Sequence, residues 1–345
     1  MISPWLNAGR DAWLEAWRPW VAGVVSDAGL GRVDGVESLR EMPWSAVFRV
    51  ICSEETLFFK AEGLGGRHEP GLVQDLAKRW GDRVPTVLAI DEARAWMLMT
   101  DAGRPLREVV PPDEQAGVLE RVMDPYVEMQ FALCAEADSL VARGVPDRRA
   151  AVLPDLLRQL LGGDMVDGAK LALESEEKSE MYALLPEFER CCEELAASAY
   201  SSSLDHGDLH ASNVLVAGEG FRLCDWGDAS VTHPFGSLMV TYRLGLSDLP
   251  AASRPSAAAR LRDAYLTAWT RHVPAGPLRR TFDLACWTAH VVRALDWVHM
   301  LQGADPEFVA EWYPHIAGAL RGWRRHRALM LSGQDAAIRV FDERS

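Results

Sequence analysis

The 345-residue sequence predicts a two-lobed α+β fold, with an antiparallel sheet in the N-terminal lobe and a mostly helical C-terminal lobe. Three observations support this prediction. Short β-like segments are concentrated between about residues 33 and 99, helical periodicity dominates after Gly103, and one β-rich segment interrupts the helices at 204–226. A chain of this length is expected to form two domains or lobes, because domains usually contain roughly 100–200 residues.

The N-terminal lobe, expected over residues 1–101, begins with an amphipathic helix. Trp13, Trp17 and Trp20 follow one another at spacings of four and three residues, which places them on one helical face. Such a stripe is typical of a helix that packs on the body of a protein. A ligand-binding aromatic face is the alternative.

The rest of this lobe is expected to consist of two hairpins separated by a helix. β-branched and apolar runs are bounded there by turn residues. In chain order we predict strands at 46–52 and 56–61, a helix at 68–79, and strands at 84–90 and 95–99. The chain then leaves the lobe through a hinge near Met99–Gly103.

The C-terminal lobe is expected over residues 102–332. A helix of about 30 residues is predicted to begin at Pro111–Asp113 and to end near Gly144. Further helices are expected at 151–161, at 176–199 and through most of 235–332. The polar residues 333–345 are expected to form a loosely held tail.

Composition and charge exclude several classes of protein. Hydrophobic residues make up 48% and charged residues 25%, as in globular rather than disordered or fibrous chains. The 36 basic and 50 acidic residues give a net charge of −14, so we expect no nucleic-acid binding, which requires clustered Lys and Arg. Without an apolar run of about 18 residues or a signal peptide, we expect no membrane association and a cytoplasmic location. Six scattered cysteines without a C-x-x-C pair favour free thiols over a zinc site.

The residues that carry chemistry lie mainly in the β-rich segment. It contains Asp-His-Gly-Asp-Leu-His-Ala-Ser-Asn at 205–213 and, after a short hairpin, Cys-Asp-Trp at 224–226. Phosphoryl transfer from ATP requires a carboxylate that orients and deprotonates the attacking hydroxyl, oxygen ligands for Mg²⁺, and a cation near the phosphates. The segment supplies the oxygen-bearing groups, and we interpret it as the catalytic part of a phosphoryl-transfer enzyme.

The spacing of these residues supports that interpretation. Asp208 and Asn213 are five residues apart on one loop and can reach one cleft, and the hairpin then returns the chain so that Asp225 lies beside Asn213. A chance loop with solvated acids is one alternative. A zinc site of His206 and His210 is another, but that spacing requires a helix, which the intervening glycine and flanking strands disfavour.

This segment resembles the aminoglycoside phosphotransferase and choline-kinase superfamily, the small-molecule branch of the protein-kinase-like fold. The pattern H-G-D-x-x-x-x-N is intact from His206 to Asn213, and the D-W element is intact at Asp225. The resemblance implies that Asp208 is the catalytic base, that His206 supports the catalytic loop, and that Asn213 and Asp225 are Mg²⁺ ligands. It also implies O-phosphorylation of a small molecule, with Mg²⁺ and ATP or GTP as cofactors, by a monomer or homodimer.

The N-terminal lobe fits the same resemblance. Lys60 matches the phosphate-binding lysine, and Glu69 matches the helix glutamate that forms an ion pair with it. Alternatives are a solvated lysine at a strand end and a carboxylate favoured by the helix dipole. Met99 and Asp101 lie in the stretch that resembles the adenine-binding hinge. The phosphate-covering loop, at about 40–45, lacks the glycines of protein kinases, and Ser45 within it is a candidate phosphate contact.

The acceptor is expected to be a small hydroxyl compound. Net charge and the position of Asp228, three residues after Asp225, favour a cationic acceptor, with an amino-sugar or aminoglycoside-like compound first. A choline-like amine, homoserine, a sugar and a macrolide are alternatives. His290 and Arg293 share a helical face and favour an anionic acceptor instead. A catalytically silent kinase-like binding protein and a nucleotidyl transferase are further alternatives.

Other residues of the helical lobe are candidates for the acceptor pocket, with a structural role as the alternative for each. They are the acidic Asp205, Asp283, Asp296 and Glu311 and the aromatic Trp287, Trp297 and Trp312.

Overall fold

The computed structural model of the chain divides into two compact units. The first contains Met1–Arg104, Val214–Asp228 and His299–Glu311, and the second contains Pro105–Asn213, Ala229–Val298 and Trp312–Ser345. The residues that the structure describes are 4–6, 9–166, 170–198, 200–218, 220–274, 278–304 and 306–339. Two segments that the sequence assigned to the C-terminal lobe, 214–228 and 299–311, therefore belong to the first unit.

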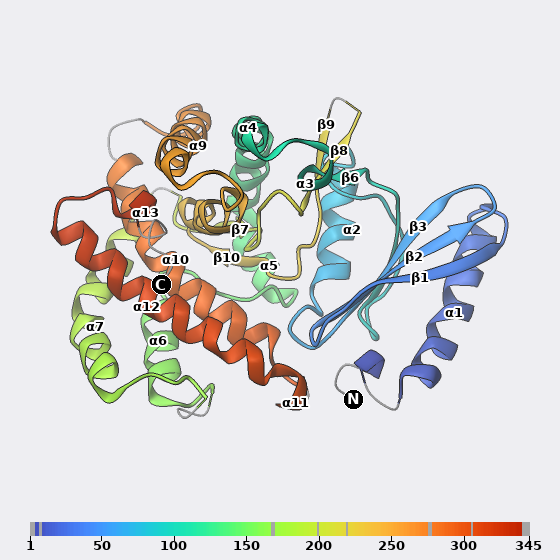
Figure 1. Cartoon of the computed structure of the whole chain (residues 1–345), viewed down its shortest axis with the longest axis horizontal. Helices are drawn as coiled ribbons and strands as arrows, with labels where there is room; N and C mark the ends of the chain where they lie inside the picture. Colours follow the sequence, from blue (N-terminus) through green and yellow to red (C-terminus); the bar gives the residue numbers. More distant parts are fainter. Residues whose placement is uncertain are drawn as a thin grey trace. The chain divides into compact units, whose positions relative to one another are not determined.

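The first unit is built on an antiparallel sheet with the strand order β1-β2-β3-β5-β4 (Figure 1). Its strands are β1 (Val33–Glu41), β2 (Ser45–Cys52), β3 (Thr56–Glu62), β4 (Val87–Asp91) and β5 (Trp96–Thr100). Four of them were predicted. The edge strand β1 was not, because it is mostly exposed and has no continuous apolar face.

Two helices cover opposite faces of this sheet (Figure 1). On one face lies α1 (Arg10–Asp27), whose Trp17 is fully buried and stacks on Phe59 at 4.2 Å between ring centroids. Because side chains alternate along a strand, Lys60 and Glu62 of β3 point to the opposite face. There α2 (Glu69–Arg79) begins. The predicted packing role of the tryptophan stripe is confirmed.

A hairpin of β8 (Val214–Ala217) and β9 (Gly220–Leu223) also belongs to the first unit, with Val214 paired to Leu223. The chain that leaves the large sheet passes close to this hairpin at Gly103. A Cβ atom on Gly103 would lie 2.2 Å from the Val216 carbonyl oxygen, and the residue has φ of +112°. Only glycine fits this position.

The second unit is mainly helical (Figure 1). The remaining α-helices and β-strands of the described residues are β6 (Arg104–Pro105), α3 (Leu106–Val109), α4 (Pro112–Leu133), α5 (Ala137–Ala142), α6 (Leu153–Gly162), α7 (Ser175–Ala196), β7 (Ser203–Asp205), β10 (Ser230–Thr232), α8 (Leu238–Val240), α9 (Arg254–Trp269), α10 (Leu278–Met300), α11 (Pro306–Val309), α12 (Tyr313–Leu331) and α13 (Ala336–Arg339). Of these, α11 lies in the first unit. The short strands β7 and β10, which flank residues 206–229 in the chain, pair antiparallel. Among the described helices, none combines the length and apolar character that a membrane span requires.

Two predictions for the helical region are wrong. The single helix of about 30 residues is divided into α4 and α5 by a 3-10 turn at Cys134–Glu136. Near this break the Gln130 carbonyl oxygen accepts the Ser203 hydroxyl at 2.6 Å. The tail is not loosely held at 336–338, since these residues are buried in α13. Residues 340–345 of the predicted tail lie outside the described residues.

Candidate functional site

Lys60 is the centre of a buried charge cluster in the first unit. Its Nζ lies 2.5 Å from Glu69 Oε2, so the predicted ion pair is present. The same nitrogen lies 2.6 Å from Asp225 Oδ1 and 2.8 Å from Glu62 Oε1. Burial opposes a charged lysine, but its acidic neighbours, Asp225 foremost, outweigh burial and raise the pKa of Lys60 well above its usual value. The lysine therefore stays charged in a buried position.

Asp225 follows β9 in a left-handed backbone conformation, with φ of 63°. Its Oδ2 accepts from Arg40 at 3.0 Å. Burial opposes ionisation, but the charges of Lys60 and Arg40 hold the pKa of Asp225 well below its usual range. The N–H of the next residue, Trp226, donates to Glu69 Oε1 at 2.8 Å, which ties this segment to α2. The result is an ionised carboxylate in a fixed position, which suits a hard cation such as Mg²⁺.

The predicted catalytic loop in the second unit is held by its own hydrogen bonds. The Asn213 amide nitrogen donates to Asp208 Oδ2 at 3.1 Å and to the Asp208 carbonyl oxygen at 2.9 Å. His210 Nε2 lies 3.2 Å from the same Oδ2. The buried His206 accepts the Asp208 N–H through Nδ1 at 3.3 Å. Because Asn213 uses its nitrogen toward Asp208, its amide oxygen faces elsewhere.

Asp205 anchors this loop from within the protein. Its Oδ1 accepts the Ser237 hydroxyl at 2.7 Å, the Tyr126 hydroxyl at 3.0 Å and the Gly207 N–H at 3.3 Å. Burial raises the pKa of Asp205, and these hydrogen bonds oppose the rise. The role of Asp205 is therefore structural. Nothing in the sequence indicated Tyr126 or Ser237, since they lie in helices and turns far along the chain.

Arg293 of α10 also reaches the catalytic loop. Its Nη2 lies 3.4 Å from Asp208 Oδ1, and its Nη1 lies 3.4 Å from the carbonyl oxygen of Gly207. The guanidinium also lies over the Trp297 ring, 5.0 Å from the centroid. His290, which the sequence grouped with Arg293, instead forms a buried pair with His326 at 3.1 Å. His290 belongs to the core, so only the arginine faces the loop.

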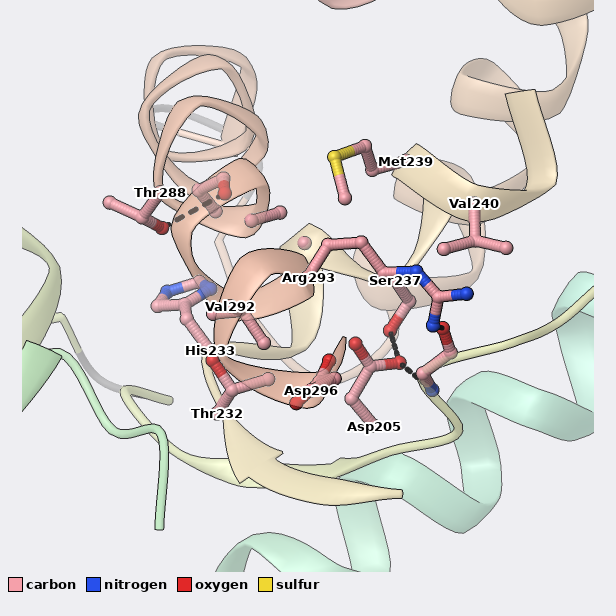
Figure 2. Close-up of a pocket in the computed structure, with 14 residues that line it drawn as sticks. Asp205, Thr232, His233, Ser237, Met239, Val240, Thr288, Val292, Arg293 and Asp296 are labelled. Atoms are coloured by element: carbon pink, nitrogen blue, oxygen red, sulfur yellow. Dashed lines mark hydrogen bonds between the residues drawn. The ribbon is translucent and has the colours of Figure 1, made fainter. Parts of the chain in front are cut away.

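A small cavity lies beside the loop within the second unit, and Figure 2 shows the side chains around it. Its walls include Asp205, Arg293 and Asp296 together with the apolar Met239 and Val292. The volume is about 10 Å³, enough for one water molecule. An amino sugar is far larger, so Asp205 and Asp296 do not form an acceptor pocket here.

Two of the other residues considered for the acceptor pocket have structural roles. Asp283 forms an ion pair with Arg279 at 3.1 Å on the same helix. Trp287 is buried in the core. Trp297 and Trp312, by contrast, are half-buried and stack with centroids 5.7 Å apart. The Trp297 ring of this pair is the one over which the Arg293 guanidinium lies.

The predicted hinge residues occupy two different environments. Met99 still lies inside the sheet, paired with Phe58 of β3 and Val87 of β4. Asp101 is exposed beyond the last strand, and its Oδ1 accepts the Gly103 N–H at 2.9 Å. The backbone that leaves the sheet therefore begins after Met99, at the residues around Asp101.

The predicted phosphate-covering loop is shorter than expected. Arg40 and Glu41 continue β1 and Ser45 begins β2, which leaves 42–44 as the turn. Ser45 is 1% exposed, and its hydroxyl makes no hydrogen bond within the described part of the chain. A phosphate contact through this hydroxyl stays a prediction. Asp228, the residue expected to favour a cationic acceptor, is half-buried.

Comparison with known proteins identifies a family. A model of the phosphotransferase enzyme family (APH) matches residues 71–276. Among curated proteins, no sequence is significantly similar to this chain.

Solved structures of related shape are numerous. A choline/ethanolamine kinase family protein from Mesorhizobium loti is 17% identical, with a TM-score of 0.61 over 95% of this chain and 98% of that one. Macrolide 2'-phosphotransferase MphH from Brachybacterium faecium is 19% identical, with a TM-score of 0.51 over 83% and 98%. A thermostable mutant of aminoglycoside phosphotransferase APH(4)-Ia, in a ternary complex with ADP and hygromycin B, is 12% identical, with a TM-score of 0.52 over 89% and 97%. At these identities the likeness shows the fold alone, and that fold is the protein-kinase-like one expected from the sequence.

Proposed function

The chain belongs to the phosphotransferase enzyme family, and we propose that it transfers the γ-phosphoryl group of a nucleoside triphosphate to a hydroxyl group of a small molecule. The observation that carries this proposal is the buried Lys60 ammonium between Glu69 and Asp225. A buried cation beside an ionised carboxylate is the arrangement that binds nucleotide phosphates together with their metal ion.

The catalytic roles are assigned to residues of the catalytic loop. Asp208 accepts the proton of the acceptor hydroxyl, and its carboxylate is oriented by the amide of Asn213. His206 holds the backbone of Asp208 through a buried hydrogen bond and thereby supports the loop. Protein side chains thus orient and deprotonate the nucleophile.

Two side chains would hold Mg²⁺. Asp225 offers an ionised carboxylate, and Asn213 offers the amide oxygen that does not face Asp208. When bound, the ion would neutralise charge on the phosphates and so favour transfer. ATP or GTP is the proposed donor, with backbone near Met99 and Asp101 as the proposed contact for the base.

For the acceptor we propose a cationic hydroxyl compound, with an amino-sugar or aminoglycoside-like molecule first and a choline-like amine second. The net charge of −14 and the half-buried Asp228 support this choice. A second candidate is an acceptor with a carboxylate or phosphate group. It is favoured by Arg293, whose guanidinium lies 3.4 Å from the Asp208 carboxylate.

The experiment that tests the function is a transfer screen with Mg·ATP and Mg·GTP. The acceptors are aminoglycosides, choline, homoserine, macrolides, neutral sugars and sugar acids, and product mass is the readout. Gain of one phosphoryl group by an amine-bearing alcohol, absent with Asp208→Asn, is the expected result.

The other outcomes separate the alternatives. Phosphorylation of only neutral or anionic alcohols would contradict the cationic acceptor but not the phosphotransfer. Gain of a nucleotide would show nucleotidyl transfer. Nucleotide binding without any product across the screen would favour a catalytically silent binding protein.

A further inference from the structure

Lys60 has one more carboxylate neighbour than the sequence predicts. Glu62 stands two residues after Lys60 on β3, so both side chains lie on the same face of the sheet. Its side chain is 1% exposed, and its Oε1 lies 2.8 Å from Lys60 Nζ. Together with Glu69 and Asp225, Glu62 gives the lysine three partners that bear a carboxyl group.

The charges of this cluster do not balance if every carboxyl group is ionised. Asp225 is assigned to the metal ion, and without it Glu62 and Glu69 carry two negative charges beside the single positive charge of Lys60. An excess charge in a buried cluster is costly unless a proton neutralises it. One of these two carboxyl groups is therefore expected to be protonated.

The hydrogen bonds identify which group carries the proton. Glu69 accepts hydrogen bonds from the Lys60 ammonium and the Trp226 N–H. Asp225 accepts hydrogen bonds from Lys60 and Arg40. Both oxygens of Glu62 lack a hydrogen bond of acceptable geometry within the described residues. Burial raises the pKa of Glu62 well above its usual value, Lys60 opposes this, and Glu69 adds to it. Glu62 is thus the carboxyl group whose ionised form is stabilised by the fewest hydrogen bonds.

The backbone brings Glu62 and Glu69 to the same place. A Cβ atom on Gly227 would lie 3.6 Å from Glu62 Oε2 and 3.5 Å from Glu69 Oε2, so both oxygens reach the same small residue. On the other side, a Cβ atom on Gly66 would lie 1.9 Å from Glu62 Oε2. Two glycines therefore make room for the Glu62 carboxyl group next to that of Glu69.

We propose that Glu62 is a positioning residue for Lys60, acting as a neutral carboxylic acid whose O–H donates to the Glu69 carboxylate while its other oxygen faces the lysine. It fixes the Glu69 carboxylate, which in turn orients the ammonium toward the phosphates. This inference rests on the proposed function, because it concerns the lysine assigned to the nucleotide.

The test compares two substitutions of nearly equal size. Glu62→Gln keeps a donor toward Glu69 and an acceptor toward Lys60, whereas Glu62→Met removes both. Mg·ATP affinity is measured by calorimetry, with thermal unfolding as the check on folding. We expect Glu62→Gln to bind within about twofold of the wild type and Glu62→Met to bind about tenfold more weakly, as for loss of a hydrogen bond to a charged group.

A spectroscopic measurement covers the case in which Glu62→Met does not fold. The infrared difference spectrum of wild type minus Glu62→Gln at neutral pH should show the carbonyl stretch of a protonated carboxylic acid. Absence of that band overturns the inference. So does a Glu62→Gln variant that binds as weakly as Glu62→Met, or a Glu62→Met variant that binds like the wild type.

Lys60→Met separates this inference from the proposed function. If Lys60→Met weakens Mg·ATP binding while the Glu62 substitutions have no effect, only the role of Glu62 is wrong. If Lys60→Met leaves the affinity unchanged, the proposed nucleotide site is wrong, and the role of Glu62 is wrong with it.

Discussion

At the scale of single residues, Asp208 is the group on which the proposed reaction depends most. Its carboxylate is oriented by Asn213 and lies near Arg293, and 21% of the side chain is exposed. These contacts hold the carboxylate in one orientation while leaving part of it accessible. They give a reason to expect that an isosteric change will affect chemistry more than folding.

Asp208→Asn should lower turnover by about 10²–10⁴-fold, since general-base catalysis contributes on that scale. Nucleotide affinity and thermal stability should stay close to those of the wild type. Initial rates with an acceptor found in the screen provide the measurement. Asp283→Asn is the matched control, because Asp283 forms an ion pair with Arg279 on its own helix. Near wild-type turnover by Asp208→Asn would remove this residue from the reaction.

The proposed metal ligands differ in charge, which predicts an order of effects. Asp225→Ala should weaken Mg²⁺-dependent ATP binding more than Asn213→Ala, because a carboxylate binds a hard cation more strongly than an amide oxygen does. Calorimetric titrations with and without Mg²⁺ separate the metal-dependent part. Unchanged metal-dependent affinity in both variants would contradict the assignment.

At the scale of elements, strand β3 shows how one segment divides packing from chemistry. Leu57, Phe59 and Ala61 are buried in the apolar cluster with α1, whereas Lys60 and Glu62 lie on the face where α2 begins. The period of two along the strand produces this division. The charged pair in an otherwise apolar strand is a local signal that points to Glu62 as well as Lys60.

Gly103 gives a prediction at the same scale, because the chain passes against β8 there. Gly103→Ala should lower the free energy of unfolding by about 2 kcal/mol or more, since a non-glycine residue at φ of +112° is strained and its Cβ would overlap the Val216 carbonyl oxygen. Chemical denaturation measures this change. Gly117→Ala is the control, as a Cβ in that interior turn of α4 meets no atom within 4 Å. It should raise stability by about 0.5–1 kcal/mol, and equal effects of the two substitutions would contradict the account of Gly103.

At the scale of the whole molecule, buried histidines link stability to pH. His233, His290 and His326 are buried, and burial lowers the pKa of each, to about 3 for His233 and for His326. In the unfolded chain a histidine titrates near about 6.5. As the pH falls below that value, the unfolded state binds protons that the folded state does not, so stability falls.

We therefore expect the melting temperature to fall progressively below about pH 6.5. Burial also raises the pKa of Asp205 and Asp283, which opposes the fall at lower pH. His233→Asn isolates one contribution, since asparagine stays neutral and can still cap the Phe235 N–H that His233 accepts at 3.2 Å. Melting temperatures across pH should fall less steeply in this variant. Identical slopes would show that His233 does not contribute.

The sequence by itself determined the fold class and the order of most elements, and it pointed to the proposed catalytic loop. These features depend on short-range information: strand and helix periods, turn residues, and polar groups at set spacings in one continuous segment. The pattern from His206 to Asn213 was readable because chemistry requires those groups within a few residues. The same holds for the family, which a model matching residues 71–276 shows.

Only the tertiary structure decided which polar residues share an environment. Arg40, Glu62 and Asp225 are distant in the chain or were hidden within strands, and their meeting at Lys60 follows from sheet register and a hairpin. Likewise, His290 has the same helical spacing whether it faces a pocket or the core, and its contact with His326 decides in favour of the core. Periodicity identifies the face of an element, but the partner of that face is set by long-range packing, which no local pattern records.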